Sequence, residues 1–226
     1  MKPFRLINFE TMFYKLINKL NHAISCPDSL VNSIGKFRLK DKTYFNFINY
    51  LKILPIKNRY SNSHSNDSQS CKTVFIMFDG TVYNTGLADK LRAITSVYYW
   101  TKKNGYDFRI LFNYPFDLQD HLIPSRYNWV VNRNSIVYCE KYAVPKALIS
   151  FNGIFGEKKN IELHKYYLDS FLKEGEKQIH LYTNTYCYEE YFRECFHELF
   201  KPSLELKKEL DYFSKEIGDN YISISF

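Results

Sequence analysis

The feature that most constrains the fold is a continuous apolar run of strand length, Thr73–Phe78, which ends in the turn signal Asp79-Gly80. A run without polar alternation is typical of a strand that is buried on both faces, as in a parallel sheet. Apolar positions at helical spacing follow from Leu87 to Tyr98, and Asn104-Gly105 supplies a left-handed C-cap. The run Phe108–Phe112 then predicts a second buried strand. Together they form a strand–turn–helix–strand unit, the building block of open α/β folds.

The same alternation recurs further along the chain. The periodicity predicts a helix over Ile161–Leu172 that ends at Gly175, a strand over Gln178–Thr183, a helix over Tyr186–Phe200, and a last helix that Ser203 caps and Gly218 ends. We therefore expect residues 71–218 to form an α/β domain with a Rossmann-like open sheet. Tyr221–Phe226 alternates like a strand, so we interpret residues 219–226 as the first strand of a missing or incomplete further domain.

The N-terminal third differs from the rest in charge. Residues 1–70 hold 11 Lys+Arg and 4 Asp+Glu, which accounts for the whole net charge of +7. Residues 10–24 have the spacing of an amphipathic helix, and residues 58–70 are too polar to fold alone. We interpret residues 1–57 as a basic helical extension and residues 58–70 as a linker. The basic segment could touch phosphates or an anionic membrane surface, or reflect codon composition alone.

Cysteine usage and hydropathy constrain the compartment. The five cysteines are odd in number and have no close zinc-type spacing, which indicates a reducing compartment without a disulfide framework. No apolar run is long enough to cross a membrane, and the N-terminus is too polar for a secretory signal. We expect a cytoplasmic protein, with peripheral membrane attachment as an alternative.

The turn between the first strand and the first helix is the segment best suited to chemistry. The first N–H groups of a helix have no intrahelical partner, and they point outward with the positive end of the helix dipole. Such an end can hold a phosphate. Gly86 would let the backbone approach an anion, and Lys90 and Arg92 add positive charge. Asp89 could instead simply complement the helix dipole.

This segment carries a resemblance to a known family. The run Gly86–Ala93 resembles the Gly-Leu-Gly-Asn-Arg-Leu-Arg loop of fucosyltransferase-like glycosyltransferases, and is more similar still to the Gly-Gly-Leu-Ala-Asp-Arg-Leu-Arg loop of a bacterial branch. The segments Pro115–Leu118 and Phe200–Ser203 are also similar to that branch. The resemblance covers residues 73–226 and leaves residues 1–72 unmatched.

The family implies the N-terminal half of a two-domain GT-B-type glycosyltransferase, with the donor held mainly by the second domain. It implies inverting transfer of fucose or a related sugar from a GDP-sugar to a hydroxyl of a glycan acceptor, with no obligatory metal and no cofactor besides the donor. Carried over, Gly86, Leu87, Lys90 and Arg92 would bind the donor phosphates. Asp89 and Arg92 would be the catalytic pair.

Two departures from the family stand out. Thr85 replaces an expected glycine, and Lys90 replaces the usual arginine, which alone can bind an oxyanion in two-pronged fashion. The sequence also stops before the donor motif of the second domain. The chain is therefore expected to be either a fragment or a degenerate, inactive relative.

Other candidate residues are less specific. Tyr127 and Trp129 could stack on an acceptor sugar or pack in the core, and Asp79 could serve as a carboxylate or as a turn residue. The histidines are scattered, and no metal-binding set is expected. Two further hypotheses remain open: a non-catalytic α/β binding or scaffold protein, and a basic nucleic-acid binder that uses residues 1–60. Residues 71–226 carry no net charge, which argues against the nucleic-acid binder. Nucleic acid is therefore not an expected partner.

Overall fold

The protein is an α/β structure built on a four-stranded parallel sheet. A computed structural model describes residues 41–61, 72–82, 86–149, 157–175 and 177–218. The sheet has the strand order β2-β1-β5-β4, and its strands are β1 (Thr73–Phe78), β2 (Asp107–Phe112), β4 (Ala143–Leu148) and β5 (Gln178–Thr183). All three neighbouring pairs are parallel. This is compatible with the expected Rossmann-like open sheet.

The two most apolar runs of the sequence form the centre of the sheet. β1 and β5 begin and end at the predicted residues, and every residue of both strands is buried. β2 begins one residue earlier than predicted, at Asp107. The edge strand β4 was not predicted, because its sequence contains Pro145 and Lys146 and lacks a continuous apolar run.

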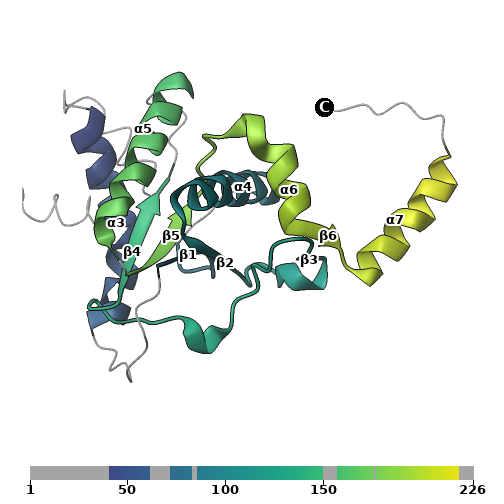
Figure 1. Cartoon of the computed structure of the whole chain (residues 1–226), viewed down its shortest axis with the longest axis horizontal. Coiled ribbons are helices and arrows are strands. Elements are labelled where there is room, and N and C mark those ends of the chain that lie inside the picture. Colours follow the sequence, from purple (N-terminus) through teal and green to yellow (C-terminus); the bar gives the residue numbers. More distant parts are fainter. Residues whose placement is uncertain (1–40, 62–71, 83–85, 150–156, 176, 219–226) are drawn as a thin grey trace, which may run out of the picture.

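Three helices cover one face of the sheet (Figure 1). They are α4 (Leu87–Asn104), α5 (Glu157–Ser170) and α6 (Phe192–Leu199). The main hydrophobic core lies between them and the sheet, and it includes Val74 and Ile76 of β1, Ile94 of α4 and Leu168 of α5. Gly105 ends α4 in the left-handed conformation, as predicted, with φ of 67°.

The helices after β4 and β5 differ in detail from the prediction. α5 ends at Ser170, and a 3-10 turn, η3 (Phe171–Glu174), continues to Gly175. The helix predicted over Tyr186–Phe200 divides into η4 (Glu189–Tyr191) and α6. Phe200 leaves the helix because it pairs with Pro124 in an antiparallel two-stranded sheet of β3 (Leu122–Pro124) and β6 (Phe200–Pro202). Two further 3-10 turns lie between the strands, η1 (Leu118–Asp120) and η2 (Arg133–Ser135).

The opposite face of the sheet is covered by a helix that was expected to belong to a separate extension. α3 (Asp41–Ser61) runs along β4, and Ile56 packs with Phe75, Met77 and Tyr182 in a second core. The linker predicted over residues 58–70 is therefore wrong for residues 58–61, which are helical. These polar residues end a helix whose buried contacts lie earlier in its sequence and at Tyr60.

A buried hydrogen-bond chain fastens α3 to the sheet. The hydroxyl of Tyr60 lies 2.6 Å from Nδ1 of His180 on β5, and Nε2 of His180 lies 3.2 Å from Oε1 of Gln178. The amide oxygen of Gln178 accepts only, so the ring carries its proton on Nε2 and Nδ1 accepts from Tyr60. Burial lowers the pKa of His180 to about 4, which keeps the ring neutral.

Replacing Tyr60 with phenylalanine is expected to destabilise the protein by about 1–3 kcal/mol, because Nδ1 of the buried His180 loses its donor. Urea unfolding of the variant measures the loss. Tyr50→Phe is the matched control, since Tyr50 is an exposed tyrosine on the same helix. Equal stability of the two variants would contradict a docking role for the Tyr60 hydroxyl.

The last described helix projects away from the sheet. α7 (Leu204–Ile217) begins at Ser203, whose hydroxyl accepts from the N–H of Leu206 at 3.2 Å, as the predicted N-cap requires. None of its residues is buried, and Figure 1 shows the helix extending to one side of the domain. Its predicted apolar face, which includes Leu210, Phe213 and Ile217, is exposed rather than packed on the core.

Several predictions fall outside the described residues. They are the helix over residues 10–24, the rest of the linker over residues 62–70, and the strand over residues 221–226. Within the described part of the chain, no helix is long and apolar enough to cross a membrane.

Candidate functional site

The turn singled out in the sequence leads into an open corner of the structure. α4 begins after Gly86, which has an extended backbone and provides no side-chain cap. Leu87 and Ala88 are exposed, and a Cβ placed on Gly86 would meet no atom within 4 Å. The first N–H groups of α4 therefore lie at an accessible helix end. With φ of −61°, Gly86 adopts a conformation that other residues can also adopt.

A groove of about 520 Å³ lies beside this helix end. One wall comes from the first turns of α4 and the other from the segment that links β5 to α6. Its lining residues are Ala88, Leu91, Arg92, Tyr186, Glu189, Glu190, Phe192 and Arg193. The groove therefore combines two guanidinium groups, two carboxylates and a phenol beside apolar surface.

Packing between α4 and η4 holds the two walls of the groove together. The rings of Tyr99 on α4 and Tyr191 on η4 stack in parallel, with centroids 3.9 Å apart and an angle of 12°. Tyr99 also contacts the ring of Tyr188 at 4.8 Å. These contacts lie in the second half of α4, and the first turns of α4 meet η4 and the beginning of α6 along the groove. The positive ends of two helix dipoles, those of α4 and α6, lie near the same groove.

Arg92 is oriented by an aromatic ring. Its guanidinium carbon lies 5.0 Å from the ring centroid of Tyr186, within the range of a cation–π contact. Asp89, one turn earlier, has a carboxylate oxygen 3.9 Å from Nη1 of Arg92. Both side chains are about half exposed, so this ion pair is weak. The structure thus brings Asp89 close to Arg92, of which only Arg92 lines the groove, and it leaves the guanidinium accessible for a ligand.

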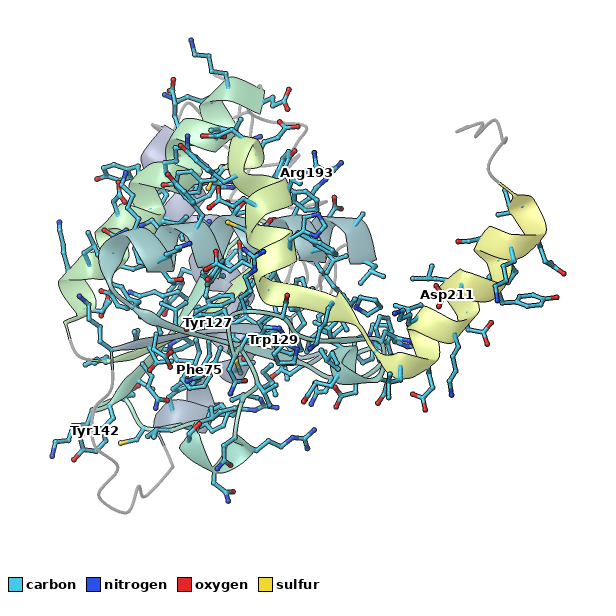
Figure 2. All side chains as sticks on the ribbon, turned by 45° about the vertical axis from the view of Figure 1, so that its right-hand side comes forward. Phe75, Tyr127, Trp129, Tyr142, Arg193 and Asp211 are labelled. Atoms are coloured by element: carbon cyan, nitrogen blue, oxygen red, sulfur yellow. The ribbon has the colours of Figure 1, made fainter. Side chains whose placement is uncertain are left out.

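The hydroxyl of Tyr186 is paired with Glu189 inside the groove. Burial, followed by a hydrogen bond to Glu189, raises the pKa of the Tyr186 hydroxyl to about 12. The phenol is therefore protonated at neutral pH and donates toward the carboxylate of Glu189. Figure 2 shows Arg193 at the beginning of α6, on the wall opposite α4.

Lys90 does not face this groove. It is 6% exposed, and its Nζ lies 3.3 Å from the carbonyl oxygen of Tyr114 and 5.0 Å from the ring centroid of Phe112. Burial lowers the pKa of its ammonium group. The expectation that Lys90 contacts a phosphate is not met in this arrangement, because the side chain packs under the start of α4 against the strand ends.

Tyr127 and Trp129 lie elsewhere in the fold. The hydroxyl of Tyr127 donates to Oδ1 of Asp107 at 2.9 Å and accepts from the N–H of Phe108 at 2.8 Å. These residues begin β2, at the amino end of the sheet, whereas Gly86 follows the carboxyl end of β1. Trp129 is 1% exposed and donates to the carbonyl of Leu199 at 2.7 Å. Their proposed acceptor role is therefore replaced by a packing role (Figure 2).

Asp79 acts as the turn residue that the sequence offered as one interpretation. Its carboxylate accepts from the N–H of Thr81 at 3.0 Å and from the hydroxyl of Thr81 at 2.5 Å. Nη1 of Arg59 on α3 and the hydroxyl of Tyr182 each lie 3.4 Å from its second oxygen. This carboxylate is occupied by protein groups. It closes the turn after β1 and links that turn to α3.

The sequence-based prediction did not include the groove residues that lie between β5 and α6. Tyr186, Glu189, Glu190 and Arg193 follow the second central strand, β5, just as Gly86–Arg92 follows β1. In parallel sheets ligands bind beyond the carboxyl ends of the strands, so the position of these residues after a buried run was an available signal. The prediction of one continuous helix over Tyr186–Phe200 concealed it.

Comparison with known proteins assigns no family. The chain matches no family model, no curated protein and no solved structure. Among the described residues, no group of three or more His, Cys, Asp or Glu side chains could hold a metal ion. The case for function therefore depends on the groove and its side chains.

Proposed function

We propose that the protein is a glycosyltransferase-like protein that binds the diphosphate of a nucleotide sugar in the groove between α4 and α6. The observation that carries the proposal is the meeting of Arg92, Arg193 and the open N-terminus of α4 around one groove of about 520 Å³. Anions are favoured at helix N-termini, and arginine binds phosphate oxygens in two-pronged fashion. The resemblance of Gly86–Ala93 to fucosyltransferase-like loops supports GDP-fucose, or a related GDP-sugar, as the donor.

In this proposal the parallel sheet is the acceptor-side domain of a GT-B-type enzyme. Transfer of the sugar builds negative charge on the departing diphosphate, and Arg92 and Arg193 would stabilise that charge. The carboxylates of Glu189 and Glu190 repel phosphate but accept hydrogen bonds from hydroxyl groups. We assign them to hydroxyl groups of the ribose or of the glycan acceptor. Asp89 would position Arg92 rather than take the acceptor proton, since its carboxylate already neighbours the guanidinium.

Replacing Arg92 with alanine is expected to weaken GDP binding about 10- to 100-fold, because a charge-assisted contact contributes about 1.5–3 kcal/mol. Arg92→Lys keeps the charge but loses the planar guanidinium and is expected to weaken binding less. Calorimetric titration measures both variants. Arg133→Ala is the matched control, an exposed arginine on η2 away from the groove. Unchanged affinity in Arg92→Ala would remove this residue from the site.

Transfer is tested separately from binding. The protein is incubated with labelled GDP-fucose and a panel of glycan acceptors, and labelled glycan is measured. Transfer that falls in Arg92→Ala supports an enzyme. Saturable binding of GDP-fucose without transfer to any acceptor favours the alternative, a non-catalytic α/β binding protein. Absence of GDP binding contradicts the proposed nucleotide-sugar site.

A further inference from the structure

Among the described residues, a short stretch of the sheet edge beside α3 has unpaired backbone groups. The N–H of Ile149 donates to Oδ1 of Asn49 on α3 at 2.8 Å, so Ile149 faces away from β5. The carbonyl of Tyr142 accepts from the N–H of Gln178 at 2.8 Å, so Tyr142 faces β5. Because successive residues of a strand point their backbone groups to alternate sides, the N–H and C=O of Ala147 face away from β5. No described residue pairs with them on that side.

The open edge is one residue long. Pro145, two residues before Ala147, has no N–H to offer. Ile149, two residues after it, already uses its N–H on Asn49. α3 lies along the rest of the strand. A long peptide therefore cannot add a strand here, whereas a ligand of the size of one amino-acid residue can pair with Ala147.

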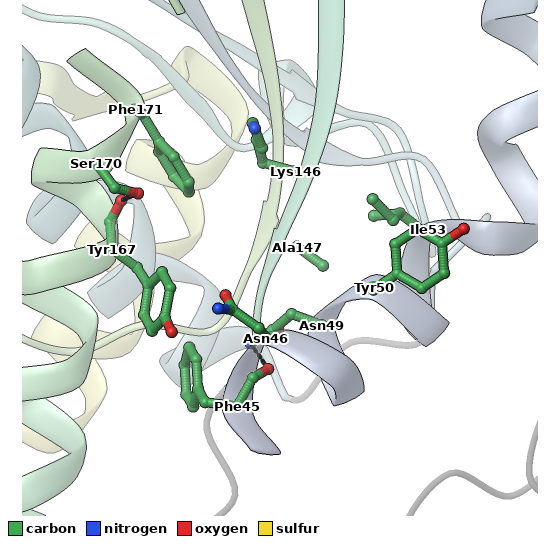
Figure 3. A pocket seen from close by; sticks show the side chains of 10 residues that line it. All are labelled: Phe45, Asn46, Asn49, Tyr50, Ile53, Lys146, Ala147, Tyr167, Ser170 and Phe171. Carbon is green, nitrogen blue, oxygen red and sulfur yellow. Dashed lines mark hydrogen bonds between the residues drawn. The ribbon is translucent and has the colours of Figure 1, made fainter. Parts of the chain in front are cut away.

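A pocket of about 340 Å³ opens at this point, between α3, β4 and α5 (Figure 3). The volume lies within the range of small-molecule sites. One wall is aromatic: the rings of Phe45 and Tyr167 stack with centroids 4.8 Å apart at 16°, and Phe171 lies beside them. Ile53 and the ring of Tyr50 form the other side. These walls can accommodate an apolar group of a ligand that pairs with the backbone of Ala147.

The polar groups of the pocket are uncharged or neutralised. Asn46 is exposed at the pocket mouth, and its amide makes no hydrogen bond to the described part of the chain. Lys146 is the charged residue in the lining, and its ammonium group is paired with Glu174. The site therefore offers a backbone N–H, a backbone C=O and a side-chain amide, without net charge.

We propose that this pocket binds a small uncharged molecule that carries an amide on each side of an apolar-substituted carbon, as in one residue of a peptide. One amide N–H of the ligand donates to the C=O of Ala147, and one amide C=O accepts from the N–H of Ala147. The side-chain amide of Asn46 hydrogen-bonds to the remaining amide group of the ligand. The apolar substituent of the ligand lies against Phe45, Tyr167 and Phe171. The pocket shares no lining residue with the groove between α4 and α6, so this inference is independent of the proposed function.

The test uses N-acetyl-L-leucine methylamide as the probe, followed by amide NMR titration of the whole chain. We expect saturable shifts at residues around Ala147, and at least tenfold weaker binding of the analogue in which both amide nitrogens are methylated, since it can donate no hydrogen bond. Asn46→Trp fills the mouth from an exposed helix position and is expected to abolish binding. Asn134→Ala, at an exposed asparagine on η2, is the matched control and is expected to bind like the unaltered protein.

The proposal is overturned by an absence of saturable shifts, by equal binding of the methylated analogue, or by undiminished binding in Asn46→Trp. A probe that binds with shifts confined to the groove between α4 and α6 would place the ligand elsewhere and overturn it as well. Loss of GDP binding in Arg92→Ala leaves the result of this titration unchanged, so failure of one proposal is distinguishable from failure of the other.

Discussion

Replacing Trp129 with alanine is expected to lower the free energy of unfolding by about 4 kcal/mol. The side chain is 1% exposed and contacts the ring of Phe200 with centroids 5.5 Å apart. Truncating a buried tryptophan costs about 3–5 kcal/mol. The carbonyl of Leu199 also loses the indole N–H that it accepts from at 2.7 Å. The free energy of unfolding of a domain of this size is about 5–15 kcal/mol, so the loss is a large share of its stability.

Urea unfolding measures this loss, and Trp129→Phe separates its two causes. The phenylalanine variant keeps an aromatic ring but lacks the N–H. The carbonyl of Leu199 still accepts from the N–H of Ser125, so the lost hydrogen bond is expected to cost only about 1 kcal/mol. Neither variant is expected to change GDP affinity while it remains folded, because Trp129 lies away from the groove. A stable Trp129→Ala variant with altered glycan binding would instead restore the acceptor role predicted from the sequence.

Acidification from pH 7 to pH 5 is expected to remove about 4 kcal/mol of stability. Burial lowers the pKa of both His164 and His180 to about 4, from the ordinary value of 6.5. At pH 5 the unfolded chain therefore binds a proton at each histidine that the folded protein excludes. Each group contributes stability that is fully present above pH 6.5 and is lost as the pH falls toward 4, about 2 kcal/mol per histidine at pH 5.

Urea titrations at several pH values measure this slope. His164 is 2% exposed, and neither of its ring nitrogens has a hydrogen-bond partner in the described structure. His164→Leu is therefore expected to halve the slope and to cost little at pH 7, because it removes an unsatisfied polar ring. His197→Gln, at an exposed position, is the control and is expected to keep the full slope. A stability that is level between pH 7 and pH 5 would contradict the neutral buried state of both rings.

The central part of the fold could be predicted because its sequence signals are local. β1 and β5 are continuous apolar runs, and α4 has both helical spacing and the left-handed Gly105. The elements at the edge of the sheet have weaker sequence patterns. The parallel partner β4 contains Pro145, which an edge strand tolerates because its backbone nitrogen, which carries no hydrogen, faces away from the sheet. The docking of α3 depends on contacts between distant residues, such as Tyr60 with His180, that no local pattern predicts.

The candidate site was predicted in part for the same reason. A strand-to-helix turn signals an anion site, so the residues at the start of α4 could be named from the sequence. Spacing alone could not show that Lys90 is buried while Leu87 is 46% exposed, since both depend on how α4 rotates on the sheet. Nor could it show that Tyr186 and Arg193 lie across the groove from Arg92. That placement results from the order of the strands, which sets β5 next to β1.

The most direct test of the phosphate site compares GDP with guanosine in calorimetric titrations of the same protein at low and at high salt. The two ligands share the base and ribose and differ in the diphosphate. If Arg92, Arg193 and the start of α4 hold the phosphates, GDP binds at least about tenfold more tightly than guanosine, and added salt reduces this advantage. Equal binding of GDP and guanosine, or no binding of either, would contradict the account.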